Sequence, residues 1–168
     1  MVALGPNEVW SMDFMHDRLA SGASYRLLTV VDIYTRECIA LFPAQRLSSA
    51  NVIEVLNVAI RKRGKPRTLR CDNGSEFASI AVDQWAYWNQ IQIDFSRPGK
   101  PTDNAFCESF NGTVRKELLN ASWFVDLAAV KKATREWQRH YNAERLHRSL
   151  GHKTPEEFAR TAKSQLAS

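Results

Sequence analysis

The sequence has few of the features that stabilise secreted or membrane-spanning proteins. It contains only three cysteines, whose wide spacing fits neither a disulfide framework nor a zinc site: Cys38, Cys71 and Cys107. No apolar run approaches the roughly 20 residues that a membrane helix requires. The segment MVALGPNEVW contains a proline and a glutamate where a signal peptide would keep an unbroken apolar stretch. We therefore expect a cytoplasmic protein with no membrane partner.

The composition is that of a globular domain, with 44% hydrophobic and 24% charged residues. The net charge of +5 is only moderately basic, so the position of the charges says more than their sum. Basic residues gather in RKRGKPR at 61–67 and again between Arg139 and Lys153. Such clusters suit a nucleic-acid phosphate backbone. A solvated helix end would give the same pattern, so charge alone leaves both readings open.

The first half of the chain alternates between strand-like and helical patterns. Three apolar runs joined by short turns predict an antiparallel meander; they cover 8–17, 25–33 and 37–42. Helical periodicity then alternates with short strand-like segments, over 48–64 (helix), 67–71 (strand), 76–89 (helix) and 91–95 (strand). Strands that alternate with helices imply crossovers to parallel strands. We predict an α/β fold in which a mixed five-stranded sheet is flanked by helices.

The second half is predicted to be helical after a proline- and glycine-containing loop at 96–104. Thr102 or Asp103 is a suitable N-cap for a helix that carries apolar residues to Leu118. Another helix is expected over about 126–142, and Thr154-Pro155-Glu156-Glu157 has the pattern of a capping box. Without repeats or a low-complexity linker, the simplest interpretation is one domain over 1–168, with a helical tail at about 121–168.

Three carboxylates occupy positions where a purely structural role is not the only explanation. Asp13 lies in the middle of an apolar strand, where it would need an arginine or a backbone amide as partner. Asp72 opens an Asp-Asn-Gly turn directly after a predicted strand, on the side where open α/β sheets bind ligands. Glu108 falls on a polar helix face that is either solvated or lines a groove for a sugar-phosphate strand.

The sequence motifs around these acids resemble those of a known family. The order Asp13, Asp72-Asn-Gly-Ser-Glu-Phe and Asp103-Asn-Ala-Phe-Cys-Glu108-Ser-Phe places 35 residues between the last two acids. This is similar to the Asp-Asp-35-Glu catalytic core of retroviral integrases and bacterial insertion-sequence transposases. The stretches 99–111 and 141–155 are especially similar to the transposase branch, and the resemblance covers about residues 7–158. It implies an RNase H-like fold.

The resemblance also implies a chemistry. It assigns Asp13, Asp72 and Glu108 as catalytic metal ligands, and three hard oxygen donors suit Mg²⁺ or Mn²⁺. Two ions would serve cleavage and strand transfer of transposon DNA ends. The implied partners are DNA and further copies of the chain on that DNA, associated with the bacterial nucleoid, with no small-molecule cofactor.

DNA contacts are expected around the acids and in the tail. The candidates are Asn104, Asn111, Arg115, Lys116, Arg145, His147 and Arg148. For the three tail residues, packing of the tail against the core is an equally good interpretation. Two other functions also stay open: an inactive transposase remnant that only binds DNA or a partner, and a nuclease of the same fold that only hydrolyses. The transposase branch usually carries a DNA-reading domain upstream, so the chain is expected to be a core fragment of a longer protein.

Overall fold

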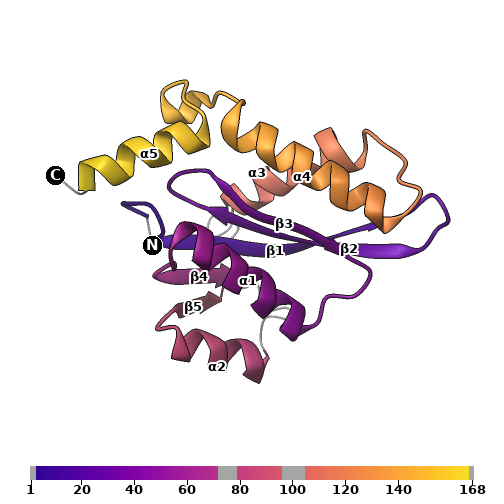
Figure 1. Cartoon of the computed structure of the whole chain (residues 1–168), viewed down its shortest axis with the longest axis horizontal. Coiled ribbons are helices and arrows are strands. Elements are labelled where there is room, and N and C mark those ends of the chain that lie inside the picture. Colours follow the sequence, from indigo (N-terminus) through magenta and orange to yellow (C-terminus); the bar gives the residue numbers. More distant parts are fainter. Residues whose placement is uncertain (1–2, 72–78, 96–104, 167–168) are drawn as a thin grey trace.

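A computed structural model describes residues 3–71, 79–95 and 105–166 (Figure 1). Its N-terminal half begins with an antiparallel meander of three strands: β1 (Val9–Arg18), β2 (Ser24–Asp32) and β3 (Cys38–Ala44). Strand β2 pairs antiparallel with both of its neighbours, and β3 forms one edge of the sheet. The predicted meander is therefore confirmed.

Two short parallel strands complete the sheet on the other side of β1. They are β4 (Thr68–Cys71) and β5 (Gln92–Phe95), and the strand order is β3-β2-β1-β4-β5. Helices α1 (Ser49–Arg63) and α2 (Ile80–Trp88) precede these strands and cover one face of the sheet (Figure 1). The mixed five-stranded sheet is thus confirmed, with the parallel pairing that alternating strands and helices predicted.

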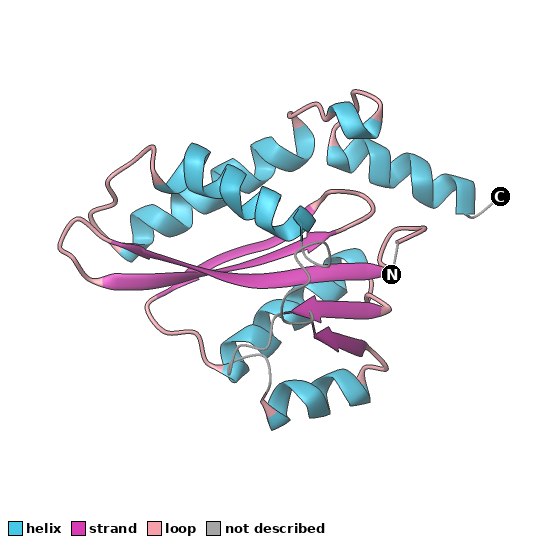
Figure 2. Ribbon diagram, turned by 180° about the vertical axis from the view of Figure 1, so that it is seen from behind, coloured by secondary structure: helices cyan, strands magenta, loops and turns pink. Residues whose placement is uncertain are grey.

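The remaining helices lie on the opposite side of the sheet (Figure 2). Helix α3 (Ala105–Val114) continues into a π-helical turn at Arg115–Leu119, and α4 (Leu127–Ala143) runs back across β3. A 3₁₀ turn at Arg148–Leu150 then leads to α5 (Pro155–Leu166), which packs against α4. Within the described ranges, no helix is long and apolar enough to cross a membrane.

The alternation of side chains along β1 builds two cores, one on each face of the sheet. Trp10 and Met12 are fully buried against α1 and α2, and the partly buried Phe14 packs beside them. Met15 points to the other face, where it packs with residues of α3 and α4 such as Phe110. Because Asp13 has the same parity as Met15, its side chain belongs to the α3 side of the sheet.

Most of the predicted helix ends are confirmed, and two bounds are corrected. Ser48 caps α1, Gly64 ends it with φ of 87°, and Thr154 forms the expected capping box with Glu157. Helix α2 begins at Ile80 rather than near 76, because the Ser79 side chain accepts a hydrogen bond from the N–H of Val82 and so caps it there. The helix expected to run to Leu118 instead changes to π geometry after Val114.

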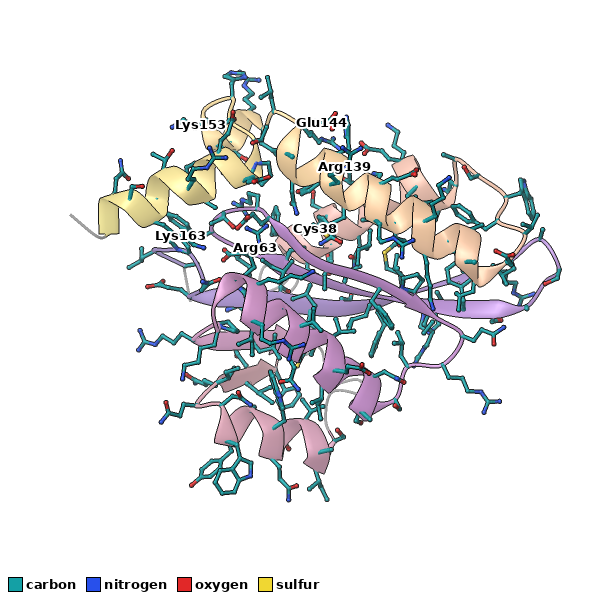
Figure 3. The ribbon with its side chains drawn as sticks, in the orientation of Figure 1. Cys38, Arg63, Arg139, Glu144, Lys153 and Lys163 are labelled. Carbon is teal, nitrogen blue, oxygen red and sulfur yellow. The ribbon has the colours of Figure 1, made fainter. Side chains whose placement is uncertain are left out.

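Helix α4 is fastened to the edge strand β3 by side-chain amides. The buried Asn142 accepts from the N–H of Cys38 at 2.8 Å and donates to the carbonyl of Cys38 at 2.9 Å. Gln138 donates to the same carbonyl at 2.8 Å. Figure 3 shows Cys38 directly below α4. These contacts satisfy peptide groups on the outer edge of β3, which no neighbouring strand pairs.

Candidate metal centre and nucleic-acid surface

Asp13 lies at the middle of the sheet, just past the point where a neighbouring strand ends. Strand β4 pairs with β1 only as far as Ser11, which lies opposite Arg70, whereas β2 continues alongside and places Thr29 opposite Asp13. The Asp13 side chain is half-buried. Its position therefore leaves the carboxylate next to the carboxyl end of a parallel strand, where α/β sheets bind ligands.

A hydrogen-bonded chain connects Asp13 to helix α3. The amide nitrogen of Asn111 donates to Oδ2 of Asp13 at 2.7 Å, and Thr29 donates from its hydroxyl to Oδ1 of Asn111 at 3.0 Å. The other carboxylate oxygen of Asp13 accepts from the N–H of Phe14 at 2.8 Å. The Asn111 amide, which the sequence suggested as a DNA contact, is thus in contact with the carboxylate.

Glu108 is exposed on the same helix, three residues before Asn111. Three residues of α-helix advance about 4.5 Å and turn to a neighbouring side. The hydrogen bond from Asn111 to Asp13 therefore brings the turn that carries Glu108 toward β1. The predicted polar face of α3 is confirmed in that Glu108 and Gly112 are both exposed.

The third predicted ligand, Asp72, lies outside the described residues, and so does Asn104. Cys71, the residue before Asp72, is buried at the end of β4. Within 3–71, 79–95 and 105–166, no three histidine, cysteine or acidic residues form a group able to hold a metal ion. Since Asp72 is not among these residues, the predicted set of three ligands is not tested.

Two cationic candidates follow Glu108 on the same segment. Arg115 donates to Oδ2 of Asp17 at 2.9 Å and to the carbonyl of His16 at 2.7 Å, so it ties the π-helical turn to the end of β1. Lys116 is exposed. The sequence alone did not predict the Asp17 partner of Arg115, because the two residues are far apart in the chain. DNA contact by either cation stays a prediction.

The tail residues pack against the core. Arg145 donates to both carboxylate oxygens of Glu117 at 2.7 Å, and its guanidinium lies 5.8 Å from the ring centre of Tyr141. His147 stacks edge-on against Tyr141 with ring centres 4.9 Å apart. Arg148 is exposed. Arg145 therefore holds the tail to Glu117 as the packing interpretation expects, whereas His147 packs on Tyr141 within the tail, and a DNA contact by any of the three tail residues is untested.

His147 is expected to make the stability of the tail depend on pH. Burial lowers the pKa of His147 below its ordinary 6.5, and Arg145 and Arg36 lower it further. Its Nε2 atom is buried without a hydrogen-bond partner in the described part of the chain. The folded state thus favours neutral imidazole, and its stabilising effect is present above pH 6.5 and is lost as the pH falls toward the lowered value.

We expect His147→Phe, which keeps the ring contact with Tyr141, to remove the part of the pH-dependent stability that His147 contributes. Urea unfolding from about pH 7.5 to about pH 5.5 should show a smaller loss of stability in the variant than in the wild type. The same measurement on His140→Gln, which replaces an exposed histidine of α4, is the control. An identical pH dependence in His147→Phe and wild type would contradict the prediction.

The order of the five strands and the helices on both faces of the sheet define an RNase H-like α/β fold. The catalytic core domain of HTLV-2 integrase, solved in complex with magnesium in a trimeric form, superposes with a TM-score of 0.77 at 22% identity, covering 94% of this chain and 99% of that one. Two models described as Integrase core domain match residues 3–101 and 89–155. The chain belongs to the integrase core domain family.

Curated relatives come from insertion elements. The 31.7 kDa protein of insertion element IS407 from Burkholderia multivorans is 44% identical over 92% of this chain and 56% of its own length. The transposase for insertion sequence element IS904 from Lactococcus lactis is 28% identical over 93% of this chain and 62% of its own length. The chain thus spans a little over half the length of these relatives.

Proposed function

We propose that the chain is the catalytic core of a DNA transposase that cleaves the ends of a mobile element and joins them to target DNA. The insertion-element relatives and the integrase core family support this reaction class. The observation that carries the proposal is the hydrogen bond from Asn111 to Asp13, which holds the helix bearing Glu108 against the central strand. Asp72 follows Cys71, the last residue of β4, directly in the sequence.

Asp13, Asp72 and Glu108 are the proposed ligands of two divalent cations. The donor set fits, because carboxylate oxygens are the hard ligands that Mg²⁺ and Mn²⁺ prefer. The magnesium bound to the structurally similar HTLV-2 domain agrees with this choice. When bound, such ions activate the attacking hydroxyl and offset the charge on the leaving 3′ oxygen. The carboxylates of the chain hold the ions, and the DNA supplies the reacting groups.

Asn111 is proposed to orient Asp13 rather than to bind DNA. Its amide nitrogen fixes Oδ2 of Asp13, and its own oxygen is fixed by Thr29, so the amide cannot turn freely. Groups that hydrogen-bond to a metal ligand typically set that ligand's orientation. Lys116, which is exposed two turns after Glu108, is the better placed phosphate contact. The implied partners are DNA and a second copy of the chain on it.

Asn111→Ala is expected to weaken metal-dependent activity by about 10- to 100-fold, because Asp13 loses its orienting hydrogen bond. The measurement is the joining rate as a function of Mn²⁺ concentration, together with the rise in melting temperature that Mn²⁺ causes. Thr113→Ala is the matched control, since the Thr113 hydroxyl donates to the carbonyl of Ser109 on its own helix. Equal Mn²⁺ dependence in the two variants would reject the orienting role.

The proposed function is tested by incubating the protein with DNA that carries the ends of its own element, with and without Mg²⁺ or Mn²⁺. Joined products that require the metal support the transposase. Hydrolysis without joining indicates a nuclease of the same fold. An inactive remnant that binds DNA or a partner would show neither reaction, and the metal would not raise its melting temperature. Either of the last two results overturns the proposal.

A further inference from the structure

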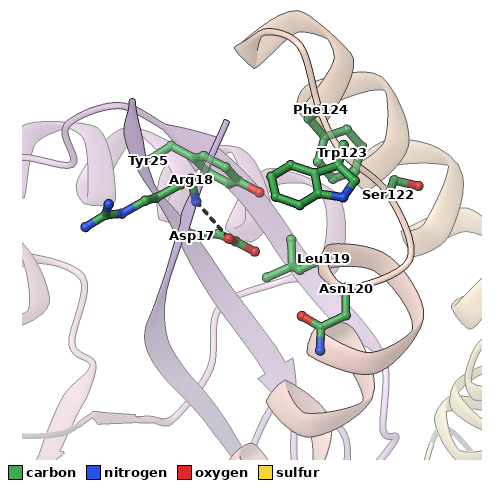
Figure 4. A pocket seen from close by; sticks show the side chains of 8 residues that line it. All are labelled: Asp17, Arg18, Tyr25, Leu119, Asn120, Ser122, Trp123 and Phe124. Carbon is green, nitrogen blue, oxygen red and sulfur yellow. Dashed lines mark hydrogen bonds between the residues drawn. The ribbon is translucent and has the colours of Figure 1, made fainter. Parts of the chain in front are cut away.

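A polar hollow lies at the far end of β1, between the β1–β2 hairpin and the segment that joins the π-helical turn to α4 (Figure 4). It encloses about 280 Å³. Side chains of aromatic, aliphatic, amide, hydroxyl and charged residues line it: Asp17, Arg18, Tyr25, Leu119, Asn120, Ser122, Trp123 and Phe124. Asp17 is neutralised by its ion pair with Arg115 at 2.9 Å. Neither Asp13 nor Glu108 lines this hollow.

A buried hydroxyl group points into the hollow without a partner. Tyr25 is 1% exposed, and its hydroxyl oxygen has no hydrogen bond within the part of the chain that the structure describes. Figure 4 shows this hydroxyl directed toward Trp123. Burial, with a further contribution from Asp17, raises the pKa of Tyr25 to about 12, so the group keeps its proton and can donate. A buried hydroxyl without a partner is costly, which favours a ligand that supplies an acceptor.

Trp123 forms an open wall of the same hollow. Its side chain is 87% exposed, and no other described aromatic ring contacts it. Trp137, by contrast, stacks on Tyr141 at 4.9 Å and donates to Glu117, so that indole is fully used in packing. Proteins that bind single-stranded nucleic acids use exposed aromatic side chains of this kind to stack on the bases.

The surroundings of the hollow suit a polyanionic strand. A second hollow of about 580 Å³ adjoins it and shares Asp17, Arg18 and Trp123. The guanidinium of the exposed Arg18 points away from the recess toward solvent (Figure 4). A base inside the recess would leave its phosphate on the solvent side, where the exposed Arg18 can meet it.

We propose that this hollow holds one unpaired nucleobase of a bound DNA strand, stacked on Trp123 and hydrogen-bonded by the Tyr25 hydroxyl. The proposal rests on the proposed function in that DNA is the substrate. Asp17 and Asp13 share one face of β1 and are four residues apart, or about 14 Å along the strand. At about 3.4 Å per base step, the bound base lies about four steps from the reacting phosphate. Enzymes that bind flipped bases stack them on aromatic side chains in this way.

The test measures binding of a labelled oligothymidylate of about 12 nucleotides by fluorescence anisotropy, with EDTA present so that metal plays no part. Trp123→Ala is expected to raise the Kd about tenfold or more. Trp88→Ala is the matched control, because Trp88 is 80% exposed at the end of α2 on the other face of the sheet. Tyr25→Phe should raise the Kd about three- to tenfold, with a melting temperature that is unchanged or higher.

A strand of the same length that lacks its bases separates base binding from phosphate binding. The strand without bases should bind the wild type about as weakly as the oligothymidylate binds Trp123→Ala. It should also bind the wild type and Trp123→Ala with the same affinity. Equal affinities of Trp123→Ala and Trp88→Ala, equal binding of the two strands by the wild type, or no binding at all would each overturn the proposal. A full joining rate in Asp72→Asn would overturn the proposed function instead, and Asp72→Asn should retain the Trp123-dependent affinity.

Discussion

Asp72→Asn or Glu108→Gln is expected to lower DNA cleavage and joining by about 10³-fold or more. Each change replaces a charged oxygen ligand by a neutral amide of nearly the same shape, and bound cations supply several kcal/mol of transition-state stabilisation. Glu108 is exposed, so its neutralisation should change the free energy of unfolding by no more than about 0.5 kcal/mol. The measurements are rates on element-end DNA with Mn²⁺ and thermal melting with and without the metal.

The metal-induced rise in melting temperature should shrink in both variants, because stabilisation by a ligand follows its affinity for the folded state. Glu136→Gln is the matched control: this exposed carboxylate on α4 lies 4.0 Å from Lys132 and far in sequence from the proposed ligands. Near-normal rates in Asp72→Asn or Glu108→Gln would show that the three acids do not form the reaction centre.

Asn142→Ala is expected to destabilise the fold by about 2–4 kcal/mol. The substitution removes both hydrogen bonds to Cys38 and leaves a buried N–H without its acceptor, which costs about 1–3 kcal/mol by itself. The truncated side chain also leaves a cavity under α4. In a chain of 168 residues this corresponds to a fall in melting temperature of roughly 5–15 °C.

The exposed amide of Gln84 on α2 provides the comparison. Gln84→Ala should change the free energy of unfolding by less than about 0.5 kcal/mol, since the Gln84 side chain is exposed and alanine favours a helix. Urea unfolding of the two variants measures the difference. If Asn142→Ala were as stable as Gln84→Ala, α4 would be held to the sheet mainly by its apolar face.

The sheet could be predicted from the sequence because its signals are local. Alternating apolar residues in 8–17 and the apolar run at 25–33 identify the strands, and helical spacing over 48–64 identifies the first crossover. Helix caps such as Ser48 and Thr154 depend on neighbours three residues away, so they too can be read directly. The parallel pairing of β4 and β5 then follows, because connections between strands are short and crossovers are right-handed.

The partners of the polar side chains could not be predicted in the same way. A helical wheel places Asn111 at the edge of a polar face but does not show that Asp13, 98 residues earlier, meets it there. The wheel also fails after Val114, because the π-helical turn changes the angle per residue and directs Arg115 to Asp17. The Asp-Asp-Glu spacing identified the candidate ligands by resemblance, since no physical rule fixes a distance between residues so far apart in the chain.

The hydrogen bonds from the side-chain amides of Asn142 and Gln138 to β3 also limit how copies of the chain can assemble. An exposed edge strand normally invites another chain to add a strand by backbone pairing. Here the outward peptide groups of Cys38 are already occupied, and Pro43 further along the same strand has no N–H to offer. Addition of a further strand along this edge is therefore hindered at both positions.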